Sequence, residues 1–300
     1  MQRYNVIYNF FIYVVLHGIV LCNSPASWDS EMQEVFARYK IVVDTNVLRQ
    51  AAIEAMARLI DPSARIINEE IFSTGEPKKE PDVKICELDK GICYIKLDAV
   101  SSGVYNELSK QLGNQDTDNI WGIVLDLRGS GGENFTEIKN IAGLLLGPSN
   151  ELYRVEDLQG NVLVTNYSEG TCGFHYSPTI IVLVNEQTSG SSELLTAVLK
   201  QREHTLVIGK RTKGNVTMQE IIELPGNIKL LMCIKRIKLK NGIILSDSID
   251  PDIPYQVISE GMAECKEKFT RDTILKQDKG VIFAFQVMHS LRALNLNGLK

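Results

Sequence analysis

The chain has 300 residues, of which 44% are hydrophobic and 23% are charged, and its formal net charge is −5. These values are typical of a globular protein with one large or two modest domains. They argue against nucleic-acid binding, because an acidic chain lacks the positive charge that neutralises phosphates. The basic run at 235–240 alternates with apolar residues, which predicts the solvated face of a strand.

The first 26 residues have the pattern of a signal peptide. Arg3 precedes an apolar run from Phe10 to Cys22, and Ser24 and Ala26 are the small residues expected just before a cleavage site. We therefore expect an exported protein, periplasmic or secreted, whose mature chain begins near Ser27. An uncleaved membrane anchor is the alternative, although the apolar run is short for a full span.

Residues 27–80 are predicted to form an N-terminal helical segment. Leu48, Ala52, Met56 and Leu59 recur at the spacing of one helix face, and Asp61-Pro62 ends the pattern. The stretch 65–81 is polar. Residues 81–300 then form the predicted core domain.

Strands alternate with helices from residue 83 onward, which predicts βαβ units and a largely parallel sheet. The hairpin at 84–95 contains two cysteines, and a two-residue turn at Asp89-Lys90 would place Cys86 directly opposite Cys93. Because a disulfide fits only certain ladder positions, two reduced thiols are favoured. No Cys/His grouping has the spacing of a zinc site, so we expect neither a metal nor another cofactor.

The remaining predicted elements are a helix at 104–112, a strand at 121–127, a helix at 135–146, a hairpin at 152–166, a strand at 179–185, a helix at 194–200, strands at 221–224 and 228–240, and helices over 258–296 with a break at 278–280.

A glycine-rich turn at 128–132 follows its strand as a phosphate-binding loop would. No Gly-Lys-Ser/Thr follows, however, and the third glycine of a dinucleotide fingerprint is missing. Nucleotide binding is therefore not expected.

The stretch 179–200 reads as a buried strand, a turn of small hydroxyl residues and a helix. Such a strand-to-helix turn exposes a side chain above a sheet edge and aims helix N–H groups at whatever binds there. That arrangement suits a nucleophile and an oxyanion hole. On local sequence alone, an ordinary loop with a serine N-cap is the more frequent explanation.

Four separated segments, at 122–132, 185–195, 208–219 and 250–253, resemble in order the C-terminal processing peptidases, also called tail-specific proteases. The resemblance covers roughly residues 30 to 290. It implies an α/β, crotonase-like (ClpP-like) core with βαβ units and a mixed sheet, preceded by helices and followed by C-terminal helices. It also implies a serine peptidase with a Ser-Lys dyad that acts on extended or C-terminal peptide segments. The PDZ domain usual in active members has no room between the N-terminal helix and the core.

The same alignment indicates a degenerate catalytic site. Laid on without gaps, the nucleophile position falls on Gly190 and the general-base position on Asn215, whereas the family's anchors are kept at Glu193 and Gln219. The family's glycine turn, which supplies N–H groups to the oxyanion hole, corresponds to Gly131 and Gly132. A weak or inactive protein that retains a peptide-binding groove is therefore expected.

Two other interpretations remain open. An active serine peptidase could use a shifted dyad, with Ser191 (or Ser189) as nucleophile and Lys213 (or Lys210) as base, although this shift breaks the register of Gln219. A structural or assembly protein of the cell envelope would be favoured if the groove were filled by the protein's own groups.

Overall fold

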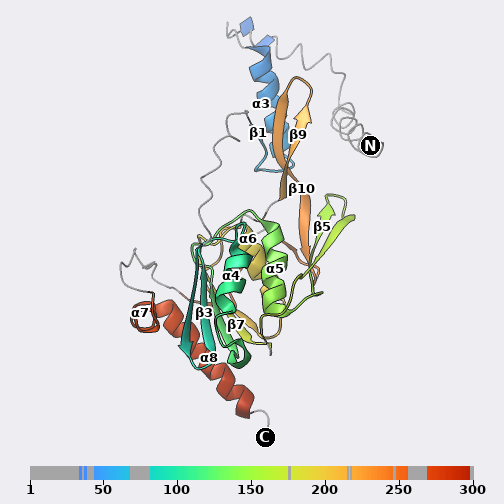
Figure 1. The fold of residues 1–300 in the computed structure, drawn as a ribbon. Coiled ribbons are helices and arrows are strands. Elements are labelled where there is room, and N and C mark those ends of the chain that lie inside the picture. Colours follow the sequence, from blue (N-terminus) through green and yellow to red (C-terminus); the bar gives the residue numbers. More distant parts are fainter. Residues whose placement is uncertain are drawn as a thin grey trace. The chain divides into compact units, whose positions relative to one another are not determined.

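The computed structural model of the chain (Figure 1) describes residues 34–35, 37–38, 44–67, 82–174, 177–214, 216, 218–245, 248–255 and 269–297. The chain divides into two compact units, Met1–Pro62 and Ser63–Lys300. The first contains helix α3 (Thr45–Arg58), whose N-cap Asp44 accepts a hydrogen bond from the backbone N–H of Asn46. The predicted signal peptide and its boundary at 26/27 lie outside the described residues, and the boundary at 80/81 remains a prediction.

The second unit is built on a six-stranded sheet, here called sheet B, with the order β12-β8-β7-β4-β3-β2. Only β2 is antiparallel to its neighbour, so the sheet is mixed, as expected. Its strands are β2 (Val83–Asp89), β3 (Ile92–Leu97), β4 (Gly122–Asp126), β7 (Thr179–Val184), β8 (Thr205–Gly209) and β12 (Ile253–Pro254).

Helices cover both faces of sheet B, which explains why the middle positions of its central strands β4 and β7 are all apolar. On β4, Ile123 and Leu125 pack into one core, and Val124 packs into the other. The first core is completed by helices α4 (Val104–Leu112), α5 (Phe135–Leu146) and α6 (Ser191–Lys200), drawn from teal to yellow in Figure 1. The second is closed by α7 (Arg271–Gln277) and α8 (Lys279–Asn297), drawn in red.

A second, antiparallel sheet, here called sheet A, is organised around the long strand β10 (Ile228–Leu239). One part of β10 pairs with β1 (Arg65–Ile67) and with β9 (Met218–Leu224). Its other part pairs with β11 (Ile244–Leu245) and with β5 (Glu151–Asp157), and β5 pairs in turn with β6 (Val162–Tyr167). The predicted turn at Asn241-Gly242 joins β10 to β11, with Gly242 at φ 88°.

Most predicted elements are confirmed within two or three residues. The break predicted at 278–280 separates α7 from α8, whereas the predicted helical stretch before residue 269 lies outside the described residues. The short 3-10 helix η2 (Thr117–Asn119) lies in a segment for which a loop was expected. Helix α6 begins at Ser191, three residues earlier than predicted, because Gly190 and Glu193 cap it. The basic run at 235–240 has alternating exposure on β10, and Ile237 and Leu239 are its buried members.

The predicted register of the first hairpin is wrong. The turn lies at Lys90-Gly91, with Gly91 at φ 78°, and a bulge shifts β2, so Cys86 pairs with Tyr94 and Cys93 pairs with Glu87. Successive strand residues point to opposite faces, and the two thiols accordingly lie in different cores. Both are free, as expected, and burial raises the pKa of Cys93 to about 12.

Candidate functional site

The predicted site residues gather at the carboxyl edge of sheet B. Loops leave the neighbouring parallel strands β3, β4, β7 and β8 at this edge and carry residues 98–103, 127–132, 185–190 and 210–214. Ligands of α/β sheets bind outside the carboxyl ends of the strands. The alternating pattern of the chain therefore brings the predicted nucleophile turn, glycine turn and base loop to one edge.

Gly190 is the N-cap of helix α6, and its backbone conformation would be strained in any residue with a side chain. Its φ is 59° and its ψ is −124°, a region that residues with a Cβ rarely adopt. A Cβ built on Gly190 would lie 2.2 Å from the carbonyl oxygen of Gly132. The backbone of the glycine turn thus occupies the space in which a nucleophilic side chain would begin.

The glycine turn is hydrogen-bonded to the nucleophile turn at several points. The Gly132 carbonyl accepts from the Ser191 N–H at 2.9 Å, and the Gly131 carbonyl accepts from the Ser192 hydroxyl at 2.8 Å. The Ser189 N–H donates to the Ser130 carbonyl at 2.9 Å, and the Ser130 and Ser192 hydroxyls lie 2.8 Å apart. These bonds fix the two turns against each other.

Gly132 also packs against the loop that follows β3. A Cβ at Gly132 would lie 2.2 Å from the Val100 carbonyl oxygen, and the φ of Gly132 is 131°. The Val100 N–H donates to the Gly131 carbonyl at 2.7 Å. Close approach of two backbones therefore requires the glycine here.

Glu193 joins the nucleophile turn to the loop after β8. Its side chain is fully buried. One carboxylate oxygen accepts from the Thr212 hydroxyl at 2.5 Å and from the Gly214 N–H at 2.7 Å, and the other accepts from the Gly190 N–H at 3.2 Å. Thr212 belongs to a segment that the sequence singled out, but its role as a partner of Glu193 was not predicted.

The two predicted dyads occupy different environments. Asn215 lies outside the described residues. Ser191 is fully buried, and its hydroxyl has no hydrogen-bond partner in the described part of the chain. Lys213 is exposed, and its backbone N–H donates to the Thr188 carbonyl at 3.0 Å. Lys210 forms an ion pair with Glu186 at 3.0 Å.

Gln219 lies on β9 with its side-chain amide directed across β10. The amide donates to the Ser63 hydroxyl at 2.9 Å, next to the start of β1. Ser63 follows the Asp61-Pro62 pair that ends the N-terminal helical pattern. This contact was not predicted from the sequence.

A buried ionic network holds Arg128, the first residue of the glycine turn. Arg128 donates from Nε to Asp126 Oδ1 at 2.9 Å and from Nη2 to Asp126 Oδ2 at 2.6 Å. It also binds Asp278 with both Nη atoms, at 3.1 and 2.6 Å. Tyr94 donates to Asp126 at 2.7 Å. Because Asp278 caps the start of α8 through the Val281 N–H, the network connects the turn after β4 to the C-terminal helices.

Electrostatics within this network favour the ionised form of Asp126. Burial alone would raise the pKa of Asp126, but the charge and hydrogen bonds of Arg128 outweigh it and hold that pKa at about 2. Burial, with the nearby Asp126 charge, raises the pKa of Tyr94 well above its ordinary value. The sequence analysis assigned no role to Asp126 and Arg128 in the segment 122–132, although an Asp-X-Arg sequence at the end of a buried strand is an available signal.

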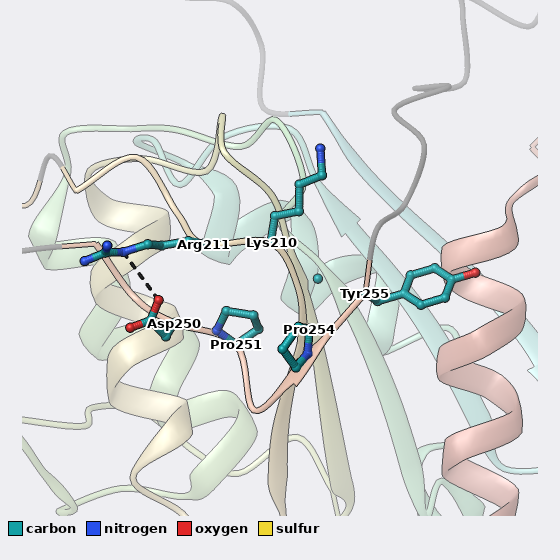
Figure 2. Close-up of a pocket in the computed structure, with 7 residues that line it drawn as sticks. Lys210, Arg211, Asp250, Pro251, Pro254 and Tyr255 are labelled. Carbon is teal, nitrogen blue, oxygen red and sulfur yellow. Dashed lines mark ion pairs between the residues drawn. The ribbon is translucent and has the colours of Figure 1, made fainter.

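An open, mostly apolar pocket of about 440 Å3 lies at the carboxyl end of β8 and β12 (Figure 2). Gly209, Pro251 and Pro254 line it. The Tyr255 ring points toward α8 and stacks on Phe283 with ring centroids 4.5 Å apart. Two basic side chains and one acidic side chain complete the lining: Lys210, Arg211 and Asp250. Such a pocket can accept an apolar segment beside charged groups.

Neither a metal site nor a membrane span is found in the described residues. None of their His, Cys, Asp and Glu side chains form a group of three or more that could hold a metal ion. Among the described helices, none combines the length and the apolar character needed to cross a membrane.

Comparisons with known proteins identify the family. A C-terminal processing peptidase of Tetradesmus obliquus, a chloroplastic protein, is 28% identical over 156 residues, which are 52% of this chain and 32% of that protein. The chloroplastic carboxyl-terminal-processing peptidase 3 of Arabidopsis thaliana is 26% identical over 226 residues, which are 74% of this chain and 42% of that protein. The chain thus spans less than half the length of either relative.

A solved lipoprotein structure from Streptococcus agalactiae shares the fold, with a TM-score of 0.54 and 18% identity over 77% of this chain and 84% of that one. The model of Peptidase family S41 matches residues 91–255, which are 165 of the 300 residues. The match contains the glycine turn, the nucleophile turn, Glu193 and Gln219. This chain therefore belongs to peptidase family S41.

Proposed function

We propose that this chain is a family member that has lost peptide-bond hydrolysis and binds extended or C-terminal peptide segments without cutting them. The observation that carries the proposal is the contact between Gly190 and Gly132. The nucleophile position has no side chain, and the Gly132 carbonyl lies 2.2 Å from where a Cβ would be. Without an attacking oxygen and with Asn215 at the base position, the covalent route of a Ser-Lys dyad is lost.

The hydrogen bonds of the nucleophile turn support the same proposal. An oxyanion hole needs N–H donors aimed at the oxygen of the substrate. Here the Ser191 N–H donates to Gly132, and the Gly190 N–H donates to Glu193. These two N–H groups, next to the predicted nucleophile position, are therefore engaged within the protein.

Binding of peptides is supported by what the carboxyl edge of sheet B retains. Hydrogen bonds connect Glu193, the glycine turn and the nucleophile turn, and the apolar pocket beside Lys210 opens at the same edge. The relatives are named for processing of protein C-termini, so we infer that peptide segments are the ligands. With the signal-like residues 1–26, we further infer that the chain is exported.

Hydrolysis of casein tests the proposal. We expect the purified chain to show no turnover above buffer, and Ser191→Ala and Lys213→Ala to behave like the parent. Robust parental hydrolysis that both substitutions abolish would contradict the proposal and establish the shifted dyad.

Peptide binding is measured separately, by fluorescence anisotropy of labelled, unstructured peptides with free C-termini. Saturable binding without cleavage is the expected result. Absence of binding in a folded, inactive protein would instead favour the structural or assembly role.

A further inference from the structure

The guanidinium of Arg128, at the start of the glycine turn, is fixed by two carboxylates. Asp126 accepts from Nε and Nη2, and Asp278 accepts from Nη1 and Nη2. The Arg128 side chain is only 13% exposed, so water cannot readily replace either partner. Because the guanidinium is planar and its donors have a fixed geometry, these bonds hold it in one orientation.

Asp278 connects the glycine turn to the C-terminal helices. It lies between α7 and α8, which close the second core, and it is 150 residues from Arg128 in the chain. The later residues of the turn are held by other elements. Gly129 donates to Asn185 in the loop after β7, and Gly132 accepts from the N–H of the first residue of α6. The C-terminal helices therefore fix the first residue of the turn through Asp278, whereas a loop and α6 hold the residues that follow.

The glycine turn carries a backbone donor that the described part of the chain does not use. The Gly132 carbonyl accepts from the Ser191 N–H, whereas the Gly132 N–H donates to no acceptor among the described residues. Carbonyl groups of an extended peptide need donors when they are buried. A donor that is already held in place binds more tightly than a mobile one, because ordering it costs nothing on binding.

We propose that Asp278 is a positioning residue of the peptide site, which it serves by holding the glycine turn through Arg128 so that the Gly132 N–H meets a bound peptide in a fixed place. The inference rests on the proposed peptide binding. Without Asp278, Nη1 of a buried guanidinium loses its acceptor. Such a group reorients toward water, because leaving it unsatisfied costs free energy. The backbone of Arg128 and the turn that follows it would then move with the side chain.

Asp278→Ser tests the proposal because it separates two roles of this residue. Asp278 also accepts from the Val281 N–H at the start of α8. Serine is about as good an N-cap as aspartate, so the variant keeps the cap, but its hydroxyl is too short and uncharged to hold Arg128. Asp278→Asn is a second variant of nearly unchanged size, and it also removes the charge that holds the guanidinium.

Amide hydrogen exchange reports the position of the turn directly. The N–H groups of Val100, Ser189 and Ser191 donate to carbonyls of the turn. Under conditions in which parent and variants are folded, their exchange should accelerate on the order of tenfold in Asp278→Ser. The Kd of a labelled peptide with a free C-terminus, measured by fluorescence anisotropy, should rise roughly tenfold in the same variant.

The matched control is Thr270→Ala, which removes the N-cap of α7 and its bond to the Thr273 N–H. This change weakens the same pair of helices outside the ionic network, so both readouts should stay at their parental values. Unchanged exchange in both Asp278 variants, or equal changes in Thr270→Ala, would overturn the proposal. Faster exchange with an unchanged Kd would also overturn it, because the turn would then take no part in binding. If the parent binds no peptide, the proposed function itself fails, and exchange alone decides whether Asp278 holds the turn.

Discussion

Two edges of the molecule differ in how their polar and apolar groups are used. At the carboxyl edge of sheet B, the segments carrying Gly132, Gly190 and Glu193 are joined by hydrogen bonds, and Glu193 is fully buried. At the outer edge of sheet A, β6 pairs with no further strand among the described residues and carries exposed apolar side chains. Hydrogen bonds between loops therefore hold the first edge together, whereas the exposed apolar side chains of β6 lie at a different edge.

Removal of the Arg128 side chain should destabilise the carboxyl edge of sheet B more than any other substitution proposed for it. Arg128→Ala leaves Asp126 buried without its cationic partner and disconnects Asp278 from the turn after β4. We expect a loss of about 4 kcal/mol in the free energy of unfolding, measured in urea. Arg154→Ala, which removes an exposed pair with Glu151, should change that free energy by less than about 0.5 kcal/mol. Equal effects of the two substitutions would show that the buried network does not stabilise the fold.

Glu193 tests whether the base loop is held by the nucleophile turn. Glu193→Ala removes the acceptor of the Thr212 hydroxyl and of the Gly190 and Gly214 N–H groups, which should cost about 3 kcal/mol of unfolding free energy. Hydrogen exchange of the Gly214 amide should accelerate at the same time. Glu186→Ala, at an exposed acid paired with Lys210, is the control and should do neither. Unchanged exchange in Glu193→Ala would contradict the connection.

Gly190→Ala, compared with Gly160→Ala, separates the clash of a Cβ with the Gly132 carbonyl from the strain of a positive φ. The new Cβ meets the Gly132 carbonyl at 2.2 Å, whereas at Gly160, also at positive φ, nothing lies within 4 Å of the corresponding Cβ. Gly160→Ala therefore reports strain alone, and Gly190→Ala should cost about 2 kcal/mol more in unfolding free energy. Equal costs would show that the Gly132 carbonyl moves away readily. In that case Gly190→Ser with Asn215→Lys becomes the substitution pair to test for restored hydrolysis.

Acid should lower the free energy of unfolding by protonating Asp126, next to the carboxyl edge of sheet B. Its folded-state pKa of about 2 lies below its ordinary value near 3.9, so its contribution is present above about pH 4 and is lost as the pH falls toward 2. The expected loss is on the order of 2 kcal/mol. The unfolding free energy measured between pH 5 and 2 should fall less steeply in Asp126→Asn than in the parent. Parallel curves would show that other carboxylates account for the acid sensitivity.

The fold was largely predictable because its signals are local and periodic. Apolar runs such as 179–184, buried on both faces, indicate a parallel sheet without knowledge of any contact. Element ends were less certain where capping decides them, as at Ser191. The predicted register of the Cys86–Cys93 hairpin failed because the turn lies one residue later than expected, at Lys90-Gly91, and a bulge near Leu88 then shifts the pairs beyond it by one residue.

The proximity of the predicted site residues could be expected from the sequence, whereas most of their contacts could not. The spacing of the family's motifs aligned Gly131, Gly190 and Glu193 with that family's site residues. These residues follow the carboxyl ends of β4 and β7, which lie side by side in sheet B. Approach of the Gly132 carbonyl to Gly190 has no sequence signal beyond the presence of two glycines. Likewise, the contacts of Arg128 with Asp278 and of Gln219 with Ser63 span 150 and 156 residues, and no local pattern encodes them.

The smallest expected change in unfolding free energy comes from Ser191→Ala. This substitution distinguishes a serine that contributes little to stability from one with an essential partner. The Ser191 hydroxyl is buried without a hydrogen-bond partner in the described residues, whereas the Ser192 hydroxyl donates to Gly131 and lies 2.8 Å from the Ser130 hydroxyl. Burial of an unsatisfied hydroxyl costs free energy, so Ser191→Ala should leave the unfolding free energy within about 0.5 kcal/mol of the parent or raise it. Ser192→Ala should lower it by about 1 to 2 kcal/mol, because the Gly131 carbonyl and the Ser130 hydroxyl lose a partner. If Ser191→Ala were instead the more damaging change, Ser191 would have an essential partner, and the shifted dyad with Lys213 would become the leading explanation of the site.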